Sequence, residues 1–136
     1  MKKAAFYLDK YSFYKIQIDF SKKLSSDLDI SFDPKGVFNS KTSEFELKIA
    51  FTSKSKESNE KFIFIECIAL FKFEDVNDFK EIPTYFYRNC IAIIFPYIRA
   101  FISTVTLQAN IPPLVLPTLN LSALEQPLKE NTSQIC

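Results

Sequence analysis

The chain has 136 residues, and its 17 Lys and Arg residues nearly cancel its 16 Asp and Glu residues. At this length we expect residues 1–136 to form a single domain, and the balanced charge argues against a nucleic-acid partner. The sequence has no histidine and only one glycine, which excludes the usual general base, the commonest metal ligand and any Gly-rich phosphate loop, so we expect neither an enzyme nor a cofactor.

Alternation of apolar and polar residues predicts three strands in the first half of the chain. The apolar members of these runs are Tyr14, Ile16, Ile18 and Phe20; then Leu28, Ile30 and Phe32; then Phe45, Leu47, Ile49 and Phe51. Polar connections separate them, and the segment Asp33-Pro34-Lys35-Gly36 has the composition of a turn. We therefore expect antiparallel hairpins.

The fourth predicted strand, Phe62–Phe73, is apolar on both faces. One face carries Phe62, Phe64, Ile68 and Leu70, and the other carries Ile63, Ile65, Cys67, Ala69, Phe71 and Phe73. A layer of helices covers one face of such a strand. Covering the other face requires a second layer or a partner chain.

The spacing of apolar residues then changes to that of a helix. One stripe is formed by Ile94, Ile98, Phe101 and Val105, with Phe95 and Ile102 beside it. Pro96 fits the first turn of this main helix, where its missing N–H costs no hydrogen bond. A shorter helix or an irregular turn over Thr84–Cys90 is expected to precede it.

Residues 111–121 contain three prolines and five Leu or Ile residues. The prolines forbid a helix or a central strand, so we expect an extended loop. Such a loop either packs across its own sheet or borders an apolar groove that receives another molecule, and both interpretations can hold for different side chains.

The segment Ser122–Glu125 has the spacing of a capping box and predicts a short final helix. Pro127 should cut or kink this helix, which leaves about residues 129–136 as a flexible tail.

The sequence also indicates where the protein acts. Asp9 comes before any apolar run of the length that a secretory signal needs, and Arg99 interrupts the longest apolar stretch. We therefore expect a cytoplasmic protein that is not an integral membrane protein. The three cysteines include no CxxC pair, so we expect Cys67 and Cys90 to be buried and assign no role to Cys136.

Two segments carry a resemblance to a known family. They are CIAIIFPYIR at residues 90–99 and LVLPTLNLSAL at residues 114–124. A Phe-Pro-Tyr-x-Arg step that opens a helix, followed by a Pro-rich Leu loop and an Asn-x-x-Ala-Leu helix start, resembles the bacterial export chaperone family SecB. The resemblance covers roughly the last third of the chain.

The resemblance implies an α+β fold: a four-stranded antiparallel sheet in meander or Greek-key-like order, a main helix, a Pro-rich crossover loop and a short second helix. It also implies a homotetramer, built as a dimer of dimers, that holds unfolded polypeptides such as secretory preproteins in apolar grooves. We assign the groove to Leu114, Leu116, Leu119, Leu121, Leu124 and Phe32, and the oligomer interface to Phe95, Ile98, Phe101, Ile102 and Val105.

Family members that deliver cargo to the translocation ATPase SecA use acidic residues on the outward sheet face and the C-terminal segment. Asp19 falls at one such acidic position, so it is our candidate for translocase docking. Lys15 lies where a second carboxylate would be expected, so delivery to SecA stays open.

Alternative functions also stay open. The first is a general holdase for export precursors, and the second is a SecB-like chaperone dedicated to one partner, such as an antitoxin. The third is a protein that binds small apolar ligands, with the Leu-rich loop as a pocket wall. An enzyme that uses Asp or Glu pairs is the least favoured, because the acidic residues mostly alternate outward on strands.

Overall fold

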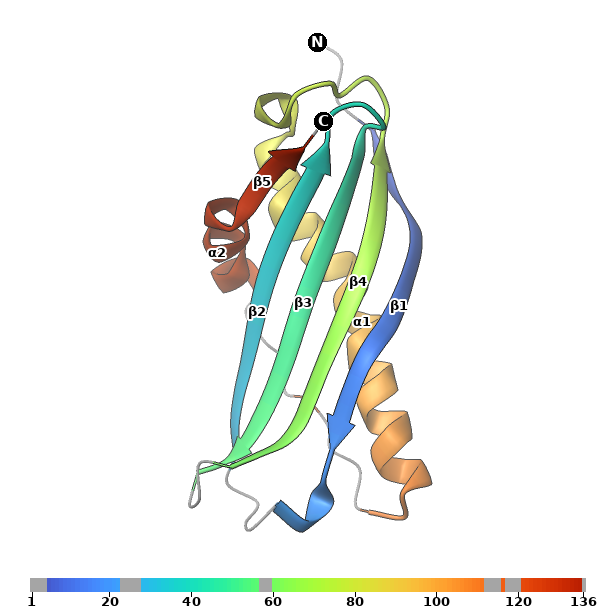
Figure 1. The fold of residues 1–136 in the computed structure, drawn as a ribbon, viewed down its shortest axis with the longest axis vertical. Coiled ribbons are helices and arrows are strands. Elements are labelled where there is room, and N and C mark those ends of the chain that lie inside the picture. The colour runs from blue at the N-terminus through green and yellow to red at the C-terminus, as the bar shows by residue number, and fades with distance from the viewer. Residues whose placement is uncertain (1–4, 23–27, 57–59, 112–115, 117–120, 136) are drawn as a thin grey trace.

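The fold is a curved sheet with one long helix across its inner face (Figure 1). The computed structural model describes residues 5–22, 28–56, 60–111, 116 and 121–135. The strands are β1 (Phe6–Ile18), β2 (Leu28–Asn39), β3 (Glu44–Ser55), β4 (Lys61–Phe73) and β5 (Thr132–Ile135), and their order in the sheet is β1-β4-β3-β2-β5.

The α+β class is confirmed, but the expected sheet of four antiparallel strands is wrong. Strands β2, β3 and β4 form an antiparallel meander and β1 pairs with β4, while a fifth strand, β5, pairs in parallel with β2. This strand lies within the segment expected to be a flexible tail, and Lys129 and Glu130 belong to helix α2 (Glu125–Glu130). The sheet is therefore mixed and has five strands.

Strand β2 is continuous through the segment that we predicted as a turn. Pro34 and Gly36 both lie inside β2, and the chain turns at residues 40–43 instead. The amide of Gly36 donates to the carbonyl of Asn131, on the side away from β3. Because backbone groups alternate sides along a strand, the N–H that Pro34 lacks would also point away from β3. The proline therefore costs β2 no hydrogen bond to β3.

The predicted face of β1 is only partly right. The strand begins at Phe6 and ends at Ile18, while Phe20 opens the short 3-10 helix η1 (Phe20–Lys22). Two bulges, between Leu8 and Lys10 and between Phe13 and Lys15, each shift the alternation by one residue. Phe13 therefore faces inward, which the simple alternation did not predict.

The inward ring of Phe13 stacks on Phe101 of α1, with ring centroids 4.2 Å apart. On the outer face, Tyr14 donates a hydrogen bond to Glu66, and burial together with this bond raises the pKa of Tyr14 to about 12.

The main helix α1 (Thr84–Gln108) is one element of 25 residues, not a short helix followed by a helix that begins at Pro96. Pro96 lies in its interior on the exposed side, where a helix bends toward solvent at least cost. By length and composition α1 could cross a membrane, and 39% of its most apolar 18-residue stretch is buried inside the fold. Its buried side packs on the sheet, as a core helix does.

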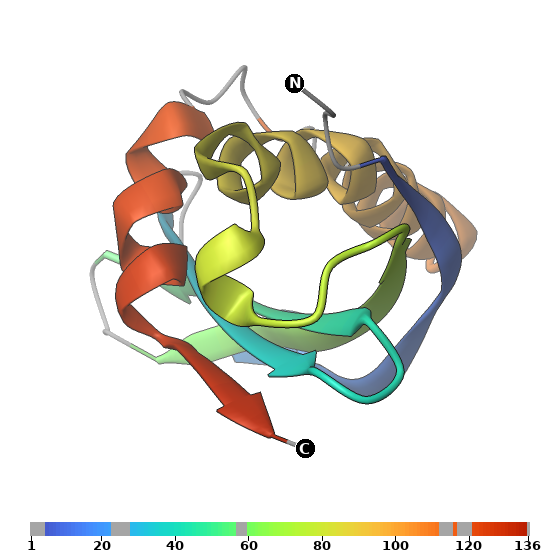
Figure 2. The ribbon, with the colours of Figure 1, turned by 90° about the horizontal axis from the view of Figure 1, so that it is seen from above.

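The core lies between α1 and the inner face of the sheet. Phe86 is its centre, with its ring centroid 4.8 Å from those of Phe6 and Phe45 and 4.7 Å from that of Phe73. The inner face of β4 is the one that carries Ile63, Ile65, Cys67, Ala69, Phe71 and Phe73, and all six are buried. On the outer face Phe64, Ile68 and Leu70 are half-buried, while both helices labelled in Figure 1 lie toward the inner side (Figure 2).

The last elements differ from the predicted capping box. A 3-10 helix, η3 (Leu121–Leu124), leads into α2, whose N-cap is Leu124 with no side-chain cap hydrogen bond. Pro127 lies in the first turn of α2 and therefore breaks no helical hydrogen bond.

Candidate functional site

Strand β2 has an open edge. Strand β5 pairs with Gly36–Asn39, and within the described residues no strand pairs with residues 28–35 on that side. Ile30 and Phe32 have the same parity as Gly36, so their N–H and C=O groups point toward this open side. Unpaired groups of this kind are a template for another extended chain.

An apolar corner lies on the inner side of this edge. The ring of Phe32 is 5.1 Å from that of Phe51 and 5.7 Å from that of Phe95 on α1. Leu28 and Ile30, on the same face of β2, are half-buried. An extended segment at the edge would therefore place alternate side chains beside apolar surface.

Two buried serine side chains lie on the same inner face, next to this apolar corner. Ser53 and Ser55 pair with Ile30 and Leu28 across β2 and β3. Both serines are fully buried, and neither Oγ atom has a hydrogen-bond partner. Sequence patterning missed them, because the strand was expected to end before residue 53.

Four of the six predicted groove residues belong to one hydrophobic cluster. Leu116 is fully buried, while Phe32, Leu121 and Leu124 are partly buried and pack against the same core. Leu114 and Leu119 lie outside the described residues. Leu116 is therefore a structural anchor, whereas the other three retain surface for a bound molecule.

The predicted interface residues fall into two groups. Phe95, Ile98 and Ile102 are buried against the chain's own sheet, and Phe101 and Val105 are half-buried. The exposed apolar residues of α1 are Tyr85 in its first turn, at 36%, and a set further along the helix: Ile93 at 37%, Tyr97 at 42% and Leu107 at 61%. They recur at intervals of four and ten residues, which places them on one side of the helix.

This exposed stripe continues onto β1. Tyr11 is 41% exposed, and its ring lies 4.5 Å from that of Tyr97. Ile16, further along β1, is 45% exposed. The stripe Ile93, Tyr97, Leu107, Tyr11 and Ile16 is called the α1–β1 stripe below.

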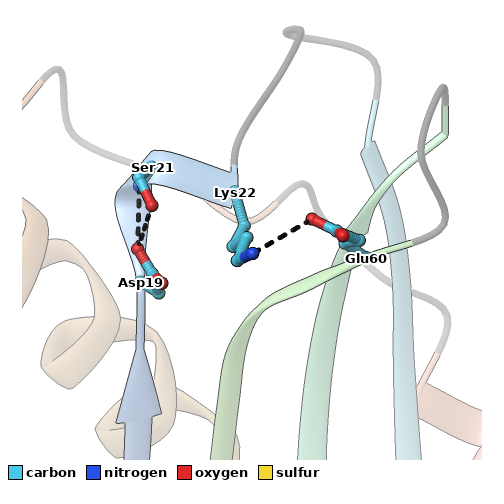
Figure 3. Close-up of polar contacts among 4 residues, drawn as sticks. All are labelled: Asp19, Ser21, Lys22 and Glu60. Carbon is cyan, nitrogen blue, oxygen red and sulfur yellow. Dashed lines mark hydrogen bonds and ion pairs between the residues drawn. The ribbon is translucent and has the colours of Figure 1, made fainter.

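Asp19 lies just beyond the end of β1 (Figure 3). Its carboxylate accepts hydrogen bonds from the hydroxyl of Ser21 at 2.5 Å and the amide of Ser21 at 3.1 Å, and these bonds lower the pKa of Asp19. Nearby, Lys22 forms an exposed ion pair with Glu60 at 3.6 Å. The Lys15 ammonium lies 5.4 Å from the ring centre of Phe64.

The described residues offer no group of three or more Cys, Asp or Glu side chains suited to a metal ion. The thiols of Cys67 and Cys90 are buried as predicted, and burial raises the pKa of both. Thiols of this kind are poor nucleophiles.

Sequence comparisons relate the chain to known proteins. A family model described as SecB, preprotein translocase subunit SecB, matches residues 5–131. The chain is 43% identical over 65 residues to an uncharacterized protein of Methanocaldococcus jannaschii and 29% identical over 105 residues to the protein-export protein SecB of Magnetococcus marinus. The matches cover 45% and 70% of this chain and span 38% and 66% of those relatives.

One solved structure shares the fold. It is a SecB-like chaperone of Mycobacterium tuberculosis in complex with a ChAD peptide from the HigA1 antitoxin. The likeness has a TM-score of 0.65 at 20% identity and covers 84% of this chain and 90% of that one.

Proposed function

The chain belongs to the SecB family of chaperones, and we propose that it holds unfolded polypeptides in extended form along the open edge of β2. The family is non-enzymatic and its members are soluble. We propose that the cargo of this protein includes secretory preproteins. The protein would act in the cytoplasm and keep these preproteins competent for translocation.

The observation that carries this proposal is the joint presence of an apolar corner at Phe32 and a strand edge with which no strand of the described residues pairs. Addition of a strand to an edge uses main-chain hydrogen bonds, which every polypeptide supplies, at about 0.5–1.5 kcal/mol each. Each apolar side chain buried alongside adds roughly 1.5–3 kcal/mol. Binding of this kind requires an extended chain and tolerates many sequences.

Strand β5 supports this mode of binding. It is an extended segment of the chain itself that pairs with the same edge of β2. The edge therefore accepts an added strand.

A second candidate is a chaperone dedicated to one partner. The relative from Mycobacterium tuberculosis was solved with a peptide from an antitoxin, which favours an antitoxin as such a partner. Binding of a small apolar ligand is a third candidate, but a small ligand would make no use of the open backbone at Ile30 and Phe32.

Docking of SecA at Asp19 is a separate hypothesis. The exposed carboxylate of Asp19 suits it, but the outer face of the sheet carries mixed charges. Lys35 on β2 and Lys48 on β3 lie opposite each other there, and Glu46 and Glu66 occupy neighbouring positions of the sheet. Close to Asp19, Lys22 forms an ion pair with Glu60, so the described residues there also carry mixed charge and form no acidic surface that attracts a basic partner.

We also propose assembly into a homotetramer, arranged as a dimer of dimers. The support is the α1–β1 stripe, because exposed apolar residues that adjoin one another mark contact surfaces. A second copy of the chain would bury Tyr97 and Ile93 there.

The function is tested by light scattering of a slowly refolding secretory precursor with and without the protein. A general holdase suppresses aggregation of several unrelated precursors, and a dedicated chaperone suppresses none of them. Phe32→Ser should weaken suppression, while Ser31→Ala on the opposite face of β2 serves as the matched control. Equal suppression by both variants would exclude the corner at Phe32 as the binding surface.

A further inference from the structure

Strand β5 occupies one part of the edge of β2 and leaves the other part open. The amide of Gly36 donates to the carbonyl of Asn131 at 3.2 Å, and the amide of Ser40 donates to the carbonyl of Ile135 at 3.0 Å. These bonds lie on the same side of β2 as the open groups of Ile30 and Phe32. The occupied and open stretches therefore lie on the same side of β2, which α2 and η3 also contact (Figure 1).

The side chains of β5 fit this position poorly. Thr132 and Gln134 pair with Gly36 and Phe38, so they face the inner, apolar side of the sheet. Ile135 faces the other way and is 52% exposed. The strand thus directs a polar residue toward Phe38 and its only apolar residue toward solvent, which is the reverse of a stable alternation.

Few contacts besides the backbone hold β5 in place. The hydroxyl of Thr132 donates to the carbonyl of Leu128 at 2.6 Å, and the side chain of Gln134 accepts from the amide of Phe79 at 2.7 Å. Ser133, Gln134 and Ile135 are all exposed. Local opening costs least in segments with little buried apolar surface and exposed hydrogen bonds.

Gly36 leaves room for whichever chain lies beside it. A Cβ atom at this position would lie 2.8 Å from Oγ1 of Thr132. Any side chain there would therefore crowd the added strand as well as the core.

We propose that the stretch Gly36–Asn39 is a second polypeptide-binding surface, which β5 occupies reversibly and from which an unfolded chain displaces it. The displacing segment carries apolar residues at alternate positions, so that it buries side chains where β5 presents Thr132 and Gln134. Displacement adds the stretch Gly36–Asn39 to the binding edge of β2. This inference rests on the proposed function, because it concerns the same edge.

The test uses fluorescence anisotropy with labelled, reduced and carboxymethylated α-lactalbumin as a permanently unfolded probe. Gln134→Ala removes the acceptor of the hydrogen bond from the amide of Phe79, so β5 should hold less tightly and affinity for the probe should rise about twofold or more, equivalent to the ~0.5 kcal/mol at the lower end for one hydrogen bond. The matched control is Ser133→Ala, a truncation on the outer face of β5 that should leave affinity unchanged. A chain that ends at Asn131 should bind the probe more tightly than the full chain.

Hydrogen exchange reads the displacement directly. Probe binding should leave the amides of Gly36 and Phe38 protected while the amides of β5 itself begin to exchange faster. Equal affinity of the Gln134→Ala and Ser133→Ala variants, or protection of β5 in the bound state, would overturn the inference. If the full chain binds no probe, both the proposed function and this inference fail. If the full chain binds the probe and the exchange of the β5 amides does not change, only the inference about β5 fails and the proposed function stands.

Discussion

The ring of Phe45 on β3 fills the space above Gly36 on β2, so that a Cβ atom at position 36 would overlap the tip of that ring. The only glycine of the chain therefore serves close packing inside a strand.

Gly36→Ala should lower the free energy of unfolding by about 1–3 kcal/mol, the usual cost of overpacking. Urea denaturation measures this change. Ser31→Ala, exposed on the same strand, should change stability by less than about 0.5 kcal/mol. Equal stability of the two variants would show that Phe45 can move aside without cost.

Phe86→Ala should lower stability by about 3–5 kcal/mol, because it removes a fully buried ring that contacts rings from three strands. Denaturant unfolding followed by circular dichroism gives the value. Phe79→Ala, at a ring that is 36% exposed, is the control and should cost far less. Similar losses in both variants would contradict the placement of Phe86 at the centre of the core.

Ser53→Ala should raise stability, in contrast to most core substitutions. The buried hydroxyl of Ser53 has no hydrogen-bond partner, and burial of such a group costs about 1–3 kcal/mol. Ser43→Ala should lower stability, because its hydroxyl donates to the carbonyl of Val76 at 2.6 Å. Thermal unfolding of the two variants compares the signs directly, and a loss of stability in Ser53→Ala would mean that this hydroxyl is paired in solution.

Ile93→Asp and Tyr97→Asp should dissociate the proposed assembly without unfolding the chain. Both side chains are exposed within one chain, so a carboxylate there is costly only when a second copy buries it. Sedimentation velocity should show smaller species for both variants and no change for Gln126→Asp on the exposed side of α2. A wild-type protein that sediments as a monomer would exclude the assembly.

Ser21→Ala should return the pKa of Asp19 toward the ordinary value of an aspartate, as measured by NMR titration of its carboxyl carbon. The hydrogen bonds from Ser21 favour the charged carboxylate, so the pKa of Asp19 in the folded protein is lowered. Their contribution to folding is present above the ordinary carboxyl pKa and is lost as pH falls through the lowered one. The amide of residue 21 still donates in this variant, so an unchanged pKa would show that the bond from the Ser21 hydroxyl does not form in solution.

The strand pattern of the sequence predicted the central part of the fold well. The inner rows of β3 and β4 follow strict alternation, since both strands lie inside the sheet and one face must be buried. We predicted that the main helix begins near Pro96, whereas α1 begins at Thr84. The backbone hydrogen bond that a proline removes from a helix is offset here, because the turns on both sides of Pro96 bury residues such as Ile94 and Ile98.

The edges of the sheet were harder to predict than its centre. The bulges of β1 depend on pairing with β4, which no local pattern reveals. Strand β5 has too few residues, and too little apolar alternation, to be distinguished from a polar tail. The predicted site shared this limit: the sequence led us to assign Phe32 to the groove, but the open backbone beside it follows only from the strand order.

The most direct test of the proposed function is backbone hydrogen exchange at Ile30 and Phe32, with and without saturating reduced, carboxymethylated α-lactalbumin. We predict fast exchange of both amides in the free protein and slowing by about tenfold or more in the complex, since exchange then proceeds only from the unbound fraction. The amides of Asp29 and Ser31 point toward β3 and serve as internal controls. Binding of the probe with no added protection at Ile30 and Phe32 would contradict the claim that unfolded chains are held along the edge of β2.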